Sequence, residues 1–97
     1  MIPIVRKGGS LPFEFDRDGE SIDGWACTIE VKKFPDSTAD VSRVVTPTDS
    51  KWKGFLTPAE TAALDVGLYH LTALLTNATT GEDEPITKRF HVARPWG

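Results

Sequence analysis

The sequence has very little of the residue types that small domains use for cross-links and for chemistry. Its 97 residues include one cysteine, so neither an internal disulfide nor a thiolate metal cluster can form. There are only two histidines, and no run approaches the roughly 18 apolar residues of a membrane-spanning helix. The formal charge is −3, not positive, which argues against a nucleic-acid-binding module.

What the sequence does contain is typical of one folded domain. Hydrophobic residues make up 39% and charged residues 26%, a globular composition. A length of 97 residues fits a single domain spanning residues 1–97, and no linker or internal repeat divides it. Arg6 and Lys7 are not followed by an apolar segment, so we do not expect the N-terminus to be a secretory signal.

Alternating hydrophobicity predicts strands along most of the chain. The clearest strand is Trp25 to Lys33, and the next clearest, Leu68 to Thr76, is expected to form a hairpin with Ile86 to Val92. Shorter strands are indicated at residues 2–5, 11–15, 41–46 and 52–56. About seven short strands separated by turns predict an all-β, antiparallel sandwich.

One short helical turn is predicted near residues 58–64. Thr57 is suited to cap it, Pro58 fits the first helical position, and Glu60 lies three residues after the cap. The segment after it, residues 65–67, ends in a glycine and stops the helix.

Asp65, Gly67 and Tyr69 have the spacing of a tyrosine corner at the entry to a late strand. In that motif the tyrosine hydroxyl bonds back to the preceding loop and holds the crossover between two sheets. An ordinary tyrosine at the start of a strand fits the spacing equally well, and both interpretations are structural.

The remaining tryptophans and the chain ends are candidate contact residues. Trp25 lies on the apolar side of its strand, whereas Trp52 and Trp96 either contact a partner or cover the edge of their own core. Residues 1–7, with Ile2 and Ile4, are expected to form an edge strand or an N-terminal arm. Residues 94–97 are expected to form a C-terminal tail, and both ends are candidates to pack on neighbouring proteins.

No motif predicts catalysis, a cofactor or a bound metal. Cys27 is interpreted as a buried, inert thiol, and His70 and His91 as surface residues on outward faces of the hairpin. The acidic segment 16–20 has only part of the ligand spacing of a calcium loop, so a hairpin turn is the simpler interpretation.

The run from Leu56 to Tyr69 has the form L-T-x-x-E-T-x-x-L-x-x-G-x-Y. With the strands on either side, it resembles the immunoglobulin-like sandwich domains of tailed-phage and prophage structural proteins. It is similar to the N-terminal domain of baseplate upper proteins and of tail-fibre attachment proteins. The resemblance covers about residues 8 to 93, and the run at 56–69 is its most specific part.

This resemblance implies a virion structural protein, assembled in the bacterial host cytoplasm, that docks onto other virion proteins as a tail, baseplate or fibre adaptor. A capsid decoration protein and a carbohydrate- or receptor-binding module are the alternatives. The module would need exposed aromatic residues, for which Trp52 and Trp96 are the candidates. The resemblance also implies a homo-oligomer, a trimer by analogy, with no enzymatic residue and no cofactor. The charge and the lack of a long apolar run predict no nucleic-acid or membrane partner.

Overall fold

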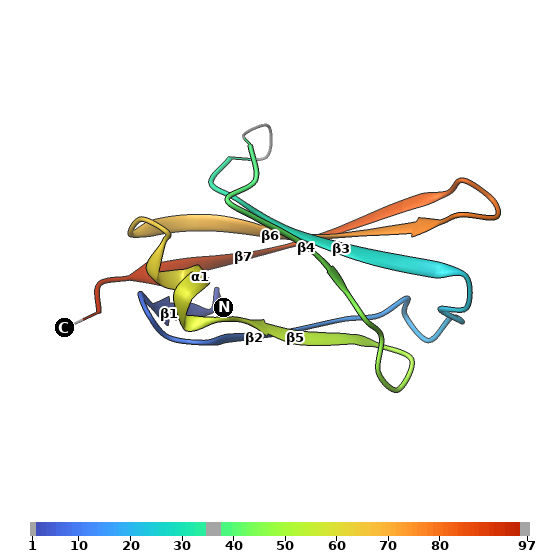
Figure 1. The fold of residues 1–97 in the computed structure, drawn as a ribbon, viewed down its shortest axis with the longest axis horizontal. Coiled ribbons are helices and arrows are strands. Elements are labelled where there is room, and N and C mark those ends of the chain that lie inside the picture. The colour runs from blue at the N-terminus through green and yellow to red at the C-terminus, as the bar shows by residue number, and fades with distance from the viewer. Residues whose placement is uncertain (1, 35–37, 96–97) are drawn as a thin grey trace.

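The structure is a computed structural model that describes residues 2–34 and 38–95. The described chain folds into a five-stranded sheet of order β1-β7-β6-β3-β4, which faces a two-stranded sheet, β2-β5 (Figure 1). An all-β fold is therefore confirmed. The elements are β1 (Ile4–Arg6), β2 (Leu11–Phe15), β3 (Trp25–Lys32), β4 (Val41–Val45), β5 (Trp52–Leu56), α1 (Pro58–Ala62), β6 (Gly67–Asn77) and β7 (Asp83–Ala93).

The centre of the larger sheet follows the sequence prediction closely. β6 pairs antiparallel with both β3 and β7, so the predicted hairpin is confirmed. Away from the strand ends, every second residue of β3 and β6 is buried against the smaller sheet. β7 begins at Asp83, three residues before its predicted start, because the ladder with β6 continues to the pair Thr76–Asp83.

The N-terminal segment corrects the expectation of a wholly antiparallel sandwich. β1 pairs in parallel with β7, with Val5 opposite Val92. Val5 is buried in the core, so residues 4–6 belong to the domain's own sheet. β1 and β7 are the first and last strands, so no hairpin fixes their relative direction and a parallel pair is possible.

The smaller sheet pairs strands that are far apart in the sequence. β2 runs antiparallel to β5, with Phe13 opposite Gly54 and Phe15 opposite Trp52. The acidic turn after β2 is therefore not the hairpin turn that the sequence predicted, since β2 and β3 lie in different sheets. The chain turns between the sheets instead, with Asp18 and Gly19 in left-handed conformations.

The helix α1 has the predicted capping box. The Glu60 N–H donates to the Thr57 hydroxyl at 3.2 Å, and the Thr57 N–H donates to the Glu60 carboxylate at 2.8 Å. Buried Thr61 accepts a hydrogen bond from the Gly8 N–H at 3.0 Å and donates one to the Gly9 carbonyl at 2.6 Å. The helix thereby fixes the turn that carries the chain from β1 in one sheet to β2 in the other.

A long cationic side chain bridges each side of the sandwich, where the two sheets share no ladder. Lys88 of β7 donates to the Glu14 carbonyl of β2 at 2.8 Å. Arg43 of β4 donates to the Phe55 carbonyl of β5 at 2.7 Å and also contacts Glu60. Each cation thus satisfies a backbone carbonyl that points away from the ladder of the smaller sheet.

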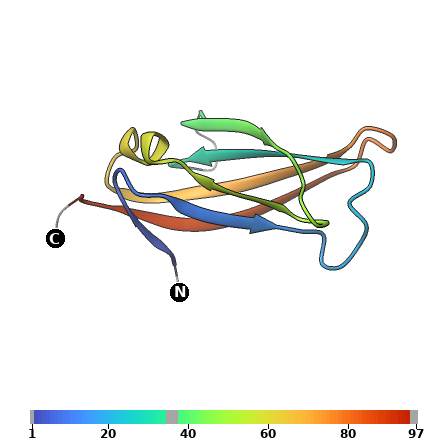
Figure 2. The ribbon, with the colours of Figure 1, turned by 60° about the horizontal axis from the view of Figure 1, so that its bottom comes forward.

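The molecule is elongated, with extents of 46 × 28 × 24 Å. One end holds α1, β1 and the end of β7, whereas the opposite end holds the β2–β3 loop and the β6–β7 turn (Figures 1 and 2). No helix among the described residues is both long enough and apolar enough to cross a membrane.

Candidate functional site

The groups that sequence reasoning considered for chemistry are not gathered into one site. Cys27 is fully buried between the sheets, and burial raises the pKa of its thiol to about 11, so it is a protonated, inert thiol at neutral pH. His70 and His91 lie on the face of the larger sheet that points away from β2-β5, where each is half-buried. Within residues 2–34 and 38–95, no three metal-ligating side chains lie close enough to hold an ion.

The residues of the expected tyrosine corner come together. The Asp65 N–H donates a hydrogen bond to the Tyr69 hydroxyl at 3.0 Å. The buried Tyr69 ring stacks on Phe90 with ring centroids 5.8 Å apart. Gly67 between them has φ +147°, a backbone conformation that favours glycine. These contacts fix the crossover from α1 into β6.

The tryptophans occupy three different situations. Trp52 is fully buried, so it belongs to the core and its interpretation as an exposed contact residue is wrong. Its alternation with Gly54 and Leu56 turns it inward despite the lysines on either side. Trp25 is half-buried, and the Arg17 guanidinium lies over its ring, 4.1 Å from the ring centroid. Trp96 lies outside the described residues.

Exposed apolar side chains gather along β1, at the margin of the larger sheet. Ile2 is 40% exposed and Ile4 69% exposed, while Val5, the middle residue of β1, is buried in the core. The Pro3 carbonyl accepts from the His91 N–H at 2.9 Å, and the Lys7 N–H donates to the Ala93 carbonyl at 3.0 Å. These bonds fix the segment on β7 while leaving the isoleucine side chains in contact with solvent.

The backbone of β1 has one free side. Pro3 and Lys7 direct backbone groups toward β7, and Val5 between them does the same because alternate residues of a strand share this direction. Ile4 therefore directs its N–H and carbonyl away from β7. The Arg6 carbonyl on that side accepts from the Gly9 N–H at 2.8 Å. The free side of β1, with Ile2 and Ile4 beside it, is called here the β1 edge. An unpaired edge with apolar side chains is a site where another chain can add a strand.

The exposed side of the larger sheet, here called the outer face, forms a second surface. Its residues alternate with the buried ones along β7, β6, β3 and β4. Near α1 it carries a basic row across three strands, Arg89, His70 and Lys32, which are direct partners in the ladders. Exposed Asp40, whose N–H donates to the Val31 carbonyl at 2.7 Å, lies at the β4 end of that row.

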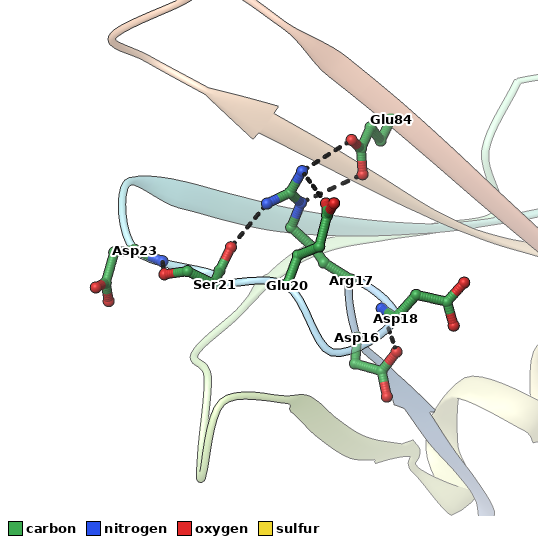
Figure 3. Close-up of polar contacts among 7 residues, drawn as sticks. All are labelled: Asp16, Arg17, Asp18, Glu20, Ser21, Asp23 and Glu84. Carbon is green, nitrogen blue, oxygen red and sulfur yellow. Dashed lines mark hydrogen bonds and ion pairs between the residues drawn. The ribbon is translucent and has the colours of Figure 1, made fainter.

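The opposite end of the molecule is organised around Arg17 (Figure 3). Its guanidinium donates to both oxygens of Glu84, at 3.0 and 3.3 Å, and to the Ser21 carbonyl at 2.7 Å. Glu20 approaches it at 3.1 Å, and the Arg17 side chain is only 12% exposed. The hydrogen bond to Glu84 raises the pKa of Arg17, although burial opposes that rise, and the same bond lowers the pKa of Glu84. Arg17 therefore joins the β2–β3 loop to the start of β7.

Four exposed carboxylates at this end make no ion pair with another described residue. They lie in the β2–β3 loop and around the β6–β7 turn, and are Asp18, Asp23, Glu82 and Asp83. An open hollow of about 680 Å³ at this end is lined by residues of β2, the loop and β7, and Asp18 is one of them. The end is thus acidic even though Arg17 neutralises part of its charge.

Sequence reasoning missed the side chains that join distant elements. Arg17, Arg43 and Lys88 gave no signal of their roles, because the partners that join them to other elements, Glu84, Phe55 and Glu14, lie at least 12 residues away along the chain. The basic row was missed for the same reason, since it exists only once the strand registers are known. No protein-family model matches this chain, and no curated protein matches it either.

Proposed function

We propose that this chain is an immunoglobulin-like domain of a tailed-phage or prophage structural protein that docks onto other virion proteins through the β1 edge. The observation that carries the proposal is the exposure of Ile2 and Ile4 beside an unpaired strand edge. Apolar groups beside free backbone donors and acceptors suit strand addition by a partner protein.

The topology supports the immunoglobulin-like part of this proposal. The order β7-β6-β3-β4 facing β2-β5 is the order of strands G, F, C, C′ and B, E in such sandwiches. The Tyr69 hydroxyl bond at the entry to β6 is in the position of the tyrosine corner. The parallel β1–β7 pair departs from a purely antiparallel pattern. An experimental structure would test whether this pair forms.

The carbohydrate- or receptor-binding alternative has less support. It depended on Trp52 and Trp96 as a pair of exposed aromatic residues, and Trp52 is buried. A tail, baseplate or fibre adaptor and a capsid decoration protein both use protein contacts. Locating the chain in the particle by electron microscopy distinguishes these two roles.

Incorporation into particles tests the docking proposal. Deleting the first residues would remove Val5 from the core, so the informative variant is I2D/I4D, which changes only exposed side chains. We expect the amount of this variant in purified particles to fall at least about tenfold, since charge at the centre of a contact is strongly unfavourable.

A matched control is Val66→Asp, another exposed apolar residue, located on the loop before β6. It should enter particles like the unmodified chain, and both variants should keep the wild-type melting temperature. Wild-type levels of I2D/I4D in particles would contradict docking through the β1 edge, and absence of the wild-type chain from particles would contradict the virion role.

A further inference from the structure

The outer face changes charge along its length. The basic row Arg89–His70–Lys32 lies toward the α1 end. Six residues further toward the β6–β7 turn along β7, the same face carries Asp83, with Glu82 next to it in the turn. Successive residues of a strand rise by about 3.4 Å, so the two charges lie about 20 Å apart.

Between the charged ends, the outer face is nearly neutral. Two neighbouring rows cross the sheet there, and their members are Thr87, Thr72, Glu30 and Ser42, followed by Pro85, Leu74, Thr28 and Val44. Glu30 is the one charged member, and Lys32 approaches it at 3.9 Å. Val44 is 73% exposed. Protein interfaces have this composition, with few charges at the centre and polar or charged residues around it.

This arrangement is complementary to itself. A two-fold axis that crosses the strands midway between Arg89 and Asp83 would place each arginine of one copy against the aspartate of the other. The same rotation lays the two neutral rows of one copy over those of its mate. We propose that the outer face pairs two copies of this chain in a face-to-face, antiparallel dimer with two-fold symmetry.

The size of the face sets the expected strength of the dimer. Four strands at about 4.8 Å spacing and a length of about 20 Å give roughly 400 Å² from each copy. Stable complexes bury about 800 Å² from each partner, so this dimer should be weak, with a dissociation constant on the order of 10 µM. Its charged margins make it sensitive to salt.

The dimer uses different residues and a different partner from the docking proposal. It involves the outer face and a second copy, whereas docking involves the β1 edge and another protein. The purified chain alone is therefore enough to test it, and failure of one proposal leaves the other standing.

Sedimentation analysis of the purified chain is the experiment, over concentrations from about tenfold below to about tenfold above the expected dissociation constant. We expect a monomer–dimer equilibrium that weakens as ionic strength rises from about 0.02 to about 0.5 M. A chain that stays monomeric over this range, or that forms a trimer, would overturn the proposal.

Charge reversals identify the face involved. Arg89→Asp and Asp83→Arg should each raise the dissociation constant by about tenfold or more, because each places like charges together. The double variant R89D/D83R restores opposite charges across the axis and should return to within about threefold of wild type. Failure of the double variant to recover would show that these residues do not face each other.

Two further variants distinguish the face from general surface effects. Val44→Asp puts a charge at the centre of the outer face and should abolish the dimer. Phe55→Asp changes a residue of similar exposure on β5 in the other sheet and should leave the dimer intact. Circular dichroism checks that all variants are folded. Equal effects of Val44→Asp and Phe55→Asp would overturn the assignment of the dimer to the outer face.

Discussion

At the scale of single residues, Tyr69 shows how one polar atom can fix a chain crossover. Its hydroxyl accepts from the Asp65 N–H at 3.0 Å while its ring is buried on Phe90. The contact ties the end of the α1 loop to the first buried residue of β6. The spacing of Asp65, Gly67 and Tyr69 was readable in the sequence because all three lie within five residues.

Tyr69→Phe removes this hydrogen bond and keeps the ring. We expect it to lower the free energy of unfolding by about 1 kcal/mol, a typical net contribution for one hydrogen bond. Urea denaturation measures the change. Thr79→Ala removes a hydroxyl from the exposed β6–β7 turn and should have almost no effect. A similar loss in both variants would contradict a specific role for the tyrosine corner.

Gly54 lies at a position where a side chain would not fit. A Cβ atom there would lie 2.9 Å from the Phe13 ring of the facing strand, which is too close. Gly54→Ala should therefore destabilise the fold by about 1–3 kcal/mol through overpacking. In a Phe13→Leu background the same substitution should cost much less, as measured in a double-mutant cycle by urea denaturation. Equal costs in both backgrounds would contradict the packing explanation.

At the scale of elements, Glu60 connects the N-terminal cap of α1 to strand β4. Glu60 closes the capping box with Thr57 and also receives Arg43 from β4, with Nε to Oε2 at 3.1 Å. Burial alone would raise the pKa of Glu60, but the hydrogen bonds from Arg43 and Thr57 outweigh it and lower the pKa. A five-residue helix is thereby anchored to β4.

This anchoring gives stability that depends on pH. A carboxyl whose folded pKa is lowered contributes stability above its unfolded pKa, about 4.3, and loses it as the pH falls through the lower folded value. Glu60→Gln should therefore be less stable than wild type at pH 7, and the difference should shrink below about pH 4. Urea denaturation across this range provides the measurement. A difference that stays constant with pH would contradict the charge contribution.

The elements also show why local patterns predict some of the fold and not the rest. The helix cap, the β6–β7 hairpin and the alternation of β3 all depend on neighbours in the sequence, and these predictions are confirmed. The pairing of β2 with β5, and of β1 with β7, joins strands that are separated along the chain by other strands, so no local pattern specifies it. Trp52 was ambiguous for the same reason, since its burial depends on the sheet opposite β5.

At the scale of the whole molecule, the sheet order predicts a gradient of local stability. β3 and β6 are paired on both sides, whereas β1 has three residues and pairs on one side. The amides of β3 and β6 should exchange with solvent only through global unfolding, and those of Val5 and Lys7 at least about tenfold faster. Hydrogen exchange followed by NMR measures both. Equal protection of β1 and β6 would show that β1 does not open independently.

Only part of the candidate site could be predicted from the sequence. Ile2 and Ile4 were identified as contact candidates because apolar residues at a chain end, beside a proline, stand out. The charge gradient of the outer face could not be read, since Arg89, His70 and Lys32 are adjacent only through the ladder registers. A surface assembled from several strands is a property of the fold and not of any segment.

The burial of Cys27 gives the protein an internal reporter of opening. It is the chain's only sulfhydryl, it lies between the two sheets with no exposed area, and burial holds its pKa at about 11. A thiol-specific alkylating reagent can react with it only while the sheets are separated, so the rate of mass increase under native conditions records how often they part. The wild-type protein therefore reports its own unfolding without a label. At high reagent concentration, where alkylation is faster than reclosing, the alkylation rate of Cys27 equals the opening rate.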